Sequence, residues 1–277
     1  MRYGLPYKGS KNRIAEEIVS MFPRSTHFYD LFAGGCSISH AAILSRKYNI
    51  IHINDKKKEI VDFFVSAIMQ QLPDGWMNAV SREEFHLMDK KDPLRLIWSF
   101  GNNGRSYLYG ETEKVKLAAH KMILSSSIAE RYQAYKEFIR ELESIRELES
   151  ITRIQSIERI HGIDLLRHLD IKVESSFVDY QDVSVLPESV VYADPPYKGT
   201  EAYSEPFDHV RFEEWLRNTS FPVFVSEYTM PSDFKCIAEF HKARAFSPCR
   251  SDKPVVDRLF IHERFENSIQ KQATFDF

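Results

Sequence analysis

Two adjacent stretches decide the fold: FYDLFAGGCSISHAAILS, residues 28–45, and NIIHINDKKKEIVDFFVSAI, residues 49–68. The first predicts a short apolar strand that ends near Leu31, then a turn of small residues and a helix. The second predicts a β-branched strand over residues 50–53, an acid at the strand end, Asp55, and another helix. A strand, a glycine turn, a helix, a strand and an acid, in this order, open a nucleotide-binding α/β sheet.

Further strands are predicted far downstream. SVVYADPPY, residues 189–197, contains an apolar strand that runs into Asp194 and two prolines, which must end it. FPVFVSEY, residues 221–228, and DRLFIHE, residues 257–263, predict two more strands, the second at a sheet edge. The sequence therefore predicts one doubly wound α/β domain whose halves are far apart in the chain.

The segment between these halves is predicted to be a separate, mostly helical insertion. We expect residues 1–75 and 169–277 to form the α/β domain and residues 76–168 to form the inserted subdomain. Within the insertion, GNNGRSYLYG, residues 101–110, places glycines and asparagines around tyrosines. This composition predicts a hairpin or a projecting loop.

A three-residue apolar repeat runs from Leu142 to Ile163. In an α-helix each such step shifts the stripe by about 60°, so the stripe circles the helix, whereas a 3₁₀ run would align it but is uncommon at this length. A packed spacer is the simpler interpretation of the repeat. A dimer contact or a DNA contact is the alternative.

Composition excludes several classes of protein. The chain has 277 residues, 43% of them hydrophobic and 28% charged, which favours a folded core over disorder. It has no apolar run long enough to span a bilayer and no apolar signal core behind its basic first 13 residues, so we expect a cytoplasmic protein. A net charge of -3 argues against a wholly basic nucleic-acid binder, but it leaves room for a local basic groove.

The residue types that commonly bind metals show no metal-binding spacing. The cysteines, Cys36, Cys236 and Cys249, form neither a paired framework nor a ligand cluster, and the ten histidines lack HxH or HExxH spacing. We therefore expect reduced, structural cysteines and no metal site.

The glycine turn and the acid after it are the first candidates for ligand contacts. DLFAGG, residues 30–35, lets a ligand approach the backbone closely, although glycine pairs also form ordinary turns. Asp55 stands where an acid can accept both hydroxyls of a ribose. A solvated acid at a strand end is the alternative interpretation of Asp55.

The tetrapeptide Asp194-Pro195-Pro196-Tyr197 carries the most specific chemistry. Two successive prolines have no N–H to donate and fix φ, so carbonyl oxygens point rigidly from the strand end. Beside them, Asp194 offers a carboxylate and Tyr197 an aromatic face. Acceptors next to a stacking ring suit an amino group on a flat heterocycle.

On these motifs the sequence resembles a known family. DPPY at a strand end with DLFAGG upstream resembles the amino-methyltransferases, and the N-terminal YKGSK, residues 7–11, with the order of motifs around the insertion resembles the Dam-type (class alpha) DNA adenine methyltransferases, including phage-borne members. The resemblance covers most of the chain and is weakest between about residues 110 and 170. It implies a Rossmann-like methyltransferase sheet with a helical target-recognition insertion, and S-adenosyl-L-methionine as the methyl donor.

The resemblance also implies a set of cofactor contacts. Lys11 would pair with the methionine carboxylate and Tyr7 would pack near the sulfonium, while Asp55 would bind the ribose. Phe177, with Asp179 nearby, matches the adenine pocket. Lys56 departs from the family, because many relatives have an apolar residue there. The complete set of implied cofactor residues is Tyr7, Lys11, Phe32, Ala33, Gly34, Gly35, Asp55, Phe177 and Asp194.

The resemblance implies catalysis by Asp194, Pro195, Pro196 and Tyr197 on an adenine flipped out of duplex DNA. The amino group would donate to the Asp194 carboxylate and the Pro195 carbonyl, aiming its lone pair at the methyl group. Neither a metal nor a covalent intermediate is required. Glu227 and Tyr228 either line the base pocket or simply end a strand, and Asp257 and Arg258 are candidates for an ion pair.

DNA recognition is expected from the insertion and the basic N-terminus. GNNGRSYLYG resembles a DNA-entering hairpin of the family, in which Arg105 would read a guanine or fill the space of the flipped base. A surface turn with phosphate contacts is the alternative. The implied DNA-binding residues are Lys8, Asn102, Asn103, Arg105 and Tyr107. A restriction endonuclease can accompany such an enzyme, and no obligate protein partner is implied.

Two other functions stay open at this point. The same site could methylate the N4 amine of cytosine, or RNA, although DPPY rather than SPPY favours adenine. A binding module that kept the fold but lost turnover is the alternative of another class, and the joint presence of Lys11, Asp55, Asp194 and Tyr197 disfavours it.

Overall fold

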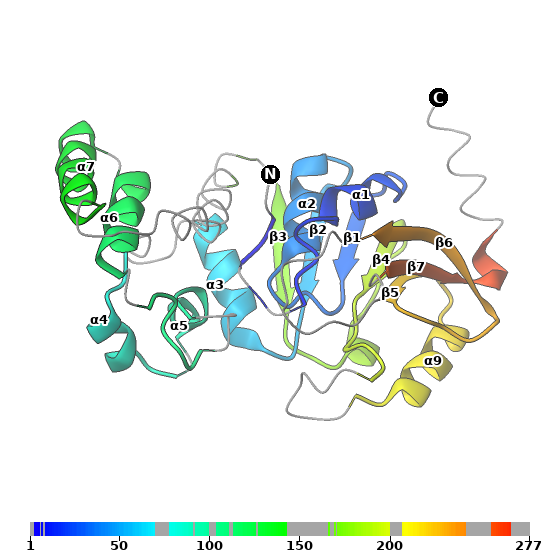
Figure 1. Ribbon diagram of the computed structural model, residues 1–277. Coiled ribbons are helices and arrows are strands. Elements are labelled where there is room, and N and C mark those ends of the chain that lie inside the picture. The colour runs from blue at the N-terminus through cyan, green and yellow to red at the C-terminus, as the bar shows by residue number, and fades with distance from the viewer. Residues whose placement is uncertain are drawn as a thin grey trace. The chain divides into compact units, whose positions relative to one another are not determined.

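In the computed structural model the chain forms two compact units. Figure 1 labels their helices and strands. The first unit comprises Met1–Asn12, Gly34–His40 and Lys57–Asp170. The second unit comprises Arg13–Ala33, Ala41–Lys56 and Ile171–Phe277. Within them, the structure describes residues 3–5, 7, 9–69, 78–90, 92–99, 104–110, 113–125, 127–142, 166, 169, 171–199, 207–241 and 256–266.

The second unit contains a seven-stranded sheet in the order β3-β2-β1-β4-β5-β7-β6. The strands β3, β2, β1, β4 and β5 are parallel, and β7 is antiparallel to both β5 and β6. Their bounds are β1 His27–Asp30, β2 Ile50–Asn54, β3 Lys172–Ser176, β4 Ser189–Ala193, β5 Val223–Glu227, β6 Phe234–His241 and β7 Val256–His262. The first five positions follow the order of a dinucleotide-binding sheet, so the fold is a doubly wound, Rossmann-like α/β fold.

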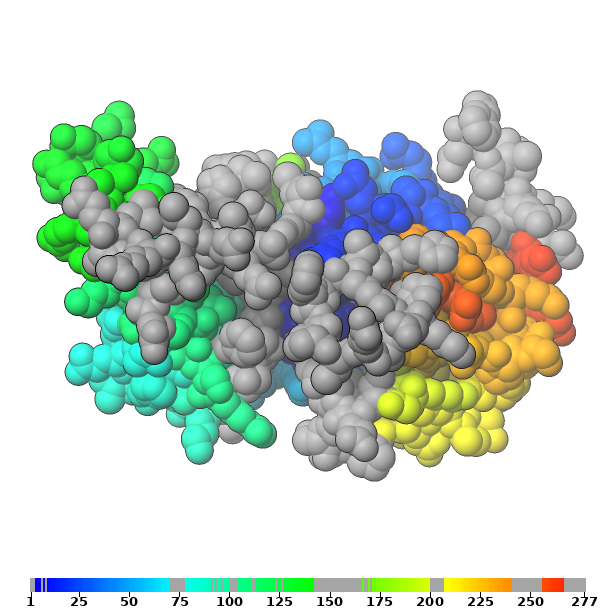
Figure 2. Space-filling view, in the orientation of Figure 1, coloured from blue at the N-terminus to red at the C-terminus, as the bar shows by residue number. Residues whose placement is uncertain are grey.

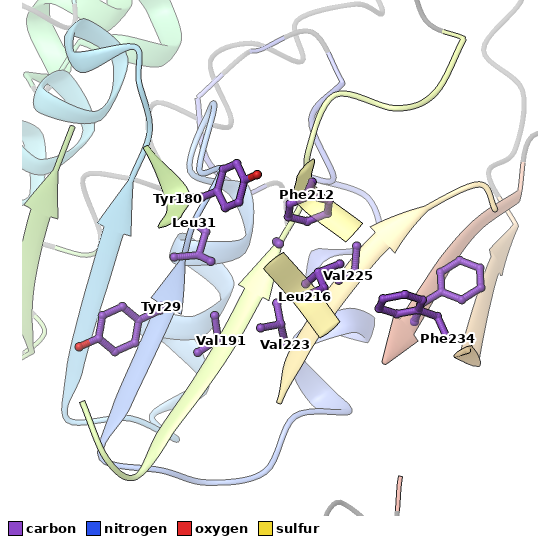
Figure 3. Close-up of a cluster of buried hydrophobic side chains, with 11 residues drawn as sticks. Tyr29, Leu31, Tyr180, Val191, Phe212, Leu216, Val223, Val225 and Phe234 are labelled. Carbon is purple, nitrogen blue, oxygen red and sulfur yellow. The ribbon is translucent and has the colours of Figure 1, made fainter. Parts of the chain in front are cut away.

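Alternate residues of the strands build an apolar core on one face of this sheet (Figure 3). Helix α9, His209–Asn218, covers that face with Phe212 and Leu216, which are almost fully buried. An aspartate caps the helix, since the side chain of Asp208 accepts from the Arg211 N–H at 3.0 Å. The buried cluster consists of Tyr29, Leu31, Tyr180, Val191, Ala193, Phe212, Leu216, Val223, Val225, Phe234 and Phe260.

The intervening strand residues face the opposite side of the sheet. Phe22, which follows α1, Ala15–Ser20, in the chain, packs on that side. The Phe22 ring lies 6.0 Å from Phe28, 5.8 Å from Tyr192 and 4.6 Å from Phe224, measured between centroids. Both faces of the sheet are therefore packed, which explains why the central strands read as nearly continuous apolar runs.

The structure confirms the strands predicted over residues 50–53, 190–193 and within 221–228, and corrects the one predicted over residues 257–263. That strand, β7, was expected at a sheet edge, but it pairs with β5 on one side and β6 on the other. The strand at this edge of the sheet is β6, whose orange segment lies at the surface in Figure 2. No local pattern in the sequence predicts the two strands at the edges of the sheet, β3 and β6.

The first unit holds the helices of the chain's middle part. Among its described residues these are, apart from α3, α4 Arg82–Leu87, α5 Pro93–Ile97, α6 Glu113–Leu124 and α7 Ile128–Leu142, and α6 packs against α7. The helix α3, Lys58–Ile68, follows β2 in the chain, and α2, Ser37–Ser45, follows the glycine turn. These two are the helices expected from the opening motif. The repeat predicted from Leu142 to Ile163 lies almost entirely outside the described residues.

Aromatic side chains form the core of the insertion. The rings of Trp98 and His120 meet edge to face with centroids 5.0 Å apart, and Tyr107 lies 5.4 Å from Phe85. All four side chains are buried. Tyr107 also donates its hydroxyl to the Val80 carbonyl at 2.6 Å. The tyrosines of GNNGRSYLYG therefore stabilise the insertion from within.

The cysteines differ in environment. Cys36 and Cys236 are reduced thiols. Cys36 is buried, in agreement with a structural role, whereas Cys236 is exposed on β6, where its thiol donates to the Ala238 carbonyl at 3.4 Å. Cys249 lies outside the described residues. Among the helices that the structure describes, none has the length and apolar character needed to cross a membrane.

Two buried histidines of the first unit make its stability depend on pH. Burial lowers the pKa of His40 to about 4 and that of His120 to about 3, from 6.5. Between pH 6.5 and these values the unfolded chain binds protons that the folded chain does not, so stability falls as the pH falls. We expect a loss of about 2 kcal/mol for each histidine between about pH 7 and pH 5.

Urea unfolding at a series of pH values measures this effect. His120→Gln should flatten the dependence, whereas the same change at the exposed His86 should leave it as in the unchanged protein. An equally steep dependence in His120→Gln would show that His120 is not responsible.

Candidate active site

The carboxyl ends of β1 and β4 lie side by side in the second unit. Asp30 pairs in register with Tyr192, and the Leu31 N–H donates to the Tyr192 carbonyl at 3.0 Å. Asp194 therefore leaves the sheet beside the segment that leads into the glycine turn. In doubly wound sheets, ligands bind at this edge, where the strand order reverses.

The residues after β4 form a partly buried polar and aromatic cluster. Asp194 is half-buried, and the Tyr197 hydroxyl is buried although part of that residue is exposed. The Tyr197 and Tyr228 rings meet edge to face with centroids 4.5 Å apart. Burial raises the pKa of Tyr197 well above 10.0, and the Asp194 charge raises it further, so this hydroxyl stays neutral at physiological pH.

A buried glutamate at the end of β5 joins this cluster. Glu227 is only 2% exposed, and its two carboxylate oxygens accept separate backbone N–H groups. Oε2 accepts from Lys198 at 3.2 Å, and Oε1 accepts from Tyr228 at 2.7 Å. Burial raises the pKa of Glu227, the two hydrogen bonds oppose this shift, and the Asp194 charge adds to it.

The candidate ion pair between Asp257 and Arg258 is wrong, because consecutive strand residues point to opposite faces. Arg258 instead pairs with Glu239 on β6 at 2.7 Å and donates to the Tyr228 carbonyl at 2.7 Å. Asp257 is buried, and its charge raises the pKa of Tyr197 and Tyr228 after the larger effect of burial.

An asparagine that the sequence analysis missed holds together the carboxyl ends of β1, β2 and β3. The Asn54 amide donates to the Leu31 carbonyl at 3.1 Å and the Val178 carbonyl at 3.2 Å. Its oxygen accepts from the Ser176 hydroxyl and the Val178 N–H. Its only sequence signal is a polar residue at the end of an apolar strand. Asp55 follows it and is half-buried.

Asp179, which follows β3 in the chain, forms ion pairs with two basic side chains. Lys56 lies 2.9 Å and Arg211 lies 3.5 Å from its carboxylate oxygens. The pKa of Asp179 is lowered, because these charges and hydrogen bonds outweigh partial burial, the largest single influence. Phe177, two residues earlier, is partly exposed. Lys56, the residue that departs from the family pattern, thus forms an ion pair with the predicted adenine-pocket acid.

In the first unit, the N-terminal segment packs directly on the glycine turn. A Cβ atom on Gly35 would lie 2.6 Å from the Tyr7 Cβ, and one on Gly34 would lie 3.1 Å from the Tyr7 ring. The Leu5 N–H donates to the Gly35 carbonyl at 2.6 Å. The two motifs that the sequence analysis associated, YKGSK and DLFAGG, therefore touch through Tyr7, and glycine is required at the contact.

Comparison with protein-family models decides the family. The model of the D12 class N6 adenine-specific DNA methyltransferases matches residues 7–209. The chain belongs to this family. It is therefore an adenine-specific DNA methyltransferase whose methyl donor is S-adenosyl-L-methionine.

Other comparisons give weaker likenesses. Two solved structures of the rRNA methyltransferase aviRa from Streptomyces viridochromogenes align with this D12 methyltransferase at TM-scores of 0.40 and 0.39, with 11% and 10% identity. The alignments cover 95% and 96% of this chain and 89% of that protein in each case. Comparison with curated protein sequences finds no match.

Other predicted cofactor residues of the D12 methyltransferase have differing surroundings. Lys11 is buried in the first unit, where the neighbouring Ser10 hydroxyl lies 2.6 Å from that of Ser37 on α2. Lys57 donates to the Tyr7 hydroxyl at 3.1 Å. Phe32 points its ring into the α9 cluster of the second unit, 5.3 Å from Tyr180, so its side chain anchors the strand end.

The predicted DNA loop is partly described. Ser99 and Tyr107 form an antiparallel bridge, as expected for a hairpin. The Gly104 N–H donates to the Ser99 hydroxyl and the Gly104 carbonyl accepts from Arg95, both at 2.8 Å. Arg105 is exposed, whereas Tyr107 is buried. Lys8, Asn102 and Asn103 lie outside the described residues.

Acidic, histidine and cysteine side chains do not gather in a metal-like group: among the residues that the structure describes, no three of them are placed to hold a metal ion.

Proposed function

We propose that this D12 methyltransferase is a Dam-type enzyme that modifies a specific sequence in duplex DNA, acting on the N6 amine of an adenine flipped out of the helix. The observation that carries the proposal is the placement of Asp194 and its two prolines at the carboxyl end of β4, in a chain whose family acts on adenine in DNA. A base inside a duplex cannot present its amino group in line with a methyl donor, so flipping is required.

Asp194, Pro195, Pro196 and Tyr197 are the proposed catalytic residues. The Asp194 carboxylate and the Pro195 carbonyl would accept from the adenine amino group, which draws its lone pair out of the ring system. The prolines fix the backbone, because both have restricted φ. Tyr197 would stack on the base, and its neutral hydroxyl avoids a second negative charge beside Asp194.

S-adenosyl-L-methionine supplies an electrophilic methyl group on a sulfonium. Two of the proposed contact residues match the charge and polarity of this cofactor. Lys11 offers a cation for the methionine carboxylate, and Asp55 offers acceptors for the ribose hydroxyls. Phe32–Gly35 would approach it through backbone and Tyr7 through its ring. Phe177 would border the adenine, with the Lys56–Asp179 pair at the same strand end in place of an apolar wall.

DNA contacts are assigned to residues 76–168, proposed as the target-recognition subdomain between catalytic parts 1–75 and 169–277. Arg105 is the main candidate for a base contact, because it is exposed and directly follows Gly104, whose backbone is hydrogen-bonded to Arg95 and Ser99. Lys8, Asn102 and Asn103 complete the proposed DNA surface, and Tyr107 would act by supporting the turn. An endonuclease that cuts the same sequence is the form a restriction partner would take.

Product analysis tests the proposed function. Unmethylated duplex DNA is incubated with the protein and isotope-labelled S-adenosyl-L-methionine, digested to nucleosides and analysed by mass spectrometry. We expect N6-methyldeoxyadenosine as the labelled product, formed at one short sequence that mapping of the modified positions identifies. N4-methyldeoxycytidine as the sole product, or label found only in added RNA, would contradict the proposal.

A further inference from the structure

Glu227 is placed where one side chain can control the geometry of the segment after β4. It ends β5, the neighbour of β4 in the sheet, and its carboxylate is almost fully buried. Burying a carboxylate is costly unless its oxygens accept hydrogen bonds, and here each oxygen accepts one backbone N–H.

One N–H group belongs to the residue after Tyr197, and the other belongs to Tyr228, its partner in the aromatic pair. Lys198 directly follows Tyr197, and Tyr228 carries the ring that meets Tyr197 edge to face at 4.5 Å. The carboxylate therefore holds both backbone segments at one distance from each other, and with them the two rings. This is a different task from contact with a substrate.

Each of the two segments has a further contact. The Lys198 ammonium pairs with Glu213 on α9, and Gly199 completes the turn in the left-handed region at φ 76°. On the β7 side, Arg258 donates to the Tyr228 carbonyl. Through these two hydrogen bonds, Glu227 joins the segment after β4 directly to the segment after β5.

We propose that Glu227 is a positioning residue for methyl transfer: its carboxylate bridges the backbone N–H groups of Lys198 and Tyr228 and so fixes Asp194 and Tyr197 relative to the target base. The inference rests on the proposed function, because the positioned groups are the proposed catalytic ones. A shift of about 1 Å in such groups can cost about 100-fold in rate, although the mutated residue never touches substrate.

Glu227→Gln tests the bridge, because the amide nitrogen cannot accept an N–H. We expect the exchange of the Lys198 or the Tyr228 amide hydrogen, followed by NMR, to accelerate by up to about tenfold. We expect the single-turnover rate of methyl transfer, normalised to the folded fraction, to fall by about 10- to 100-fold. The dissociation constants for S-adenosyl-L-methionine and for DNA should change by less than about threefold, since Glu227 is almost fully buried and both of its carboxylate oxygens accept backbone N–H groups.

Two further variants separate bridging from charge and from general destabilisation. Glu227→Asp keeps the charge but is one methylene too short to reach both N–H groups, so we expect it to be slowed as well. Glu188→Gln is the matched control: Glu188 is exposed at the amino end of β4, where it accepts from the Thr26 hydroxyl at 2.8 Å. Its rate should stay within about twofold of the unchanged protein.

Each outcome has a defined meaning. Faster amide exchange together with slower transfer in both Glu227 variants would support the proposal. Unchanged exchange, or faster exchange with an unchanged rate, would overturn it. A failure of the unchanged protein to methylate adenine would instead overturn the proposed function, and the exchange measurement would still report whether the bridge exists.

Discussion

Replacing Asp194 with alanine is expected to lower the single-turnover rate of methyl transfer by at least about 100- to 1,000-fold. Removing one preorganised partner of a developing charge costs this much in other enzymes. Here the loss should be at the upper end, because the adenine amino group is a poor nucleophile until acceptors draw its lone pair out of the ring. Asp194 provides the only carboxylate within the catalytic tetrapeptide.

The affinity for DNA separates this effect from loss of the fold. Binding of duplex DNA rests mainly on phosphate contacts, which the proposal assigns to residues outside β4, so it should stay within about tenfold. Asp182→Ala, at an exposed aspartate of the 3₁₀ turn Tyr180–Asp182, is the control and should leave the rate unchanged. An Asp194→Ala protein that transfers methyl at the normal rate would remove Asp194 from the mechanism.

The central strands could be predicted from sequence because both of their faces are buried. β4 and β5 consist almost entirely of buried residues, which gives a continuous apolar signal. The edge strands lack this signal. β3 has the sequence KVESS and is partly exposed, so neither an apolar run nor an alternation marks it. The position of β7 inside the sheet depends on its pairing with β6, which no local pattern reveals.

The residues of the candidate site also differ in whether the sequence could reveal them. Asp194 to Tyr197 could be found because two prolines after an apolar strand are rare and chemically specific. Glu227 and Asn54 act through hydrogen bonds to backbone groups distant in the chain. Sequence alone therefore leaves Asn54 as an ordinary polar residue at a strand end, and it leaves Glu227 between a base-pocket residue and a plain strand end. Tyr107 shows the reverse error: a tyrosine in a polar loop suggests a surface contact, but its ring is buried in the insertion.

A methyl group added at Gly4 is expected to weaken binding of S-adenosyl-L-methionine by about tenfold or more. A Cβ atom there would lie 2.3 Å from the Gly35 carbonyl oxygen and 2.6 Å from the Ser37 nitrogen, both backbone atoms. Gly4 also adopts φ +67°, which alanine adopts only with strain. Its N–H donates to the buried His40 Nδ1 at 3.0 Å, a bond that displacement would break.

The N-terminal segment around Gly4 cannot shift to relieve this clash without moving the residues that follow it. Displacing Gly4 also shifts Leu5, whose N–H donates to Gly35, and then Tyr7 and Lys11, the proposed cofactor contacts. Titration calorimetry of Gly4→Ala measures the affinity, and thermal unfolding measures whether the sheet survives. Gly110→Ala is the matched control, since its Cβ would meet nothing within 4 Å, and it should bind as the unchanged protein does. Normal affinity in Gly4→Ala would mean that the N-terminal segment does not hold the cofactor, because a clash of this size must move it.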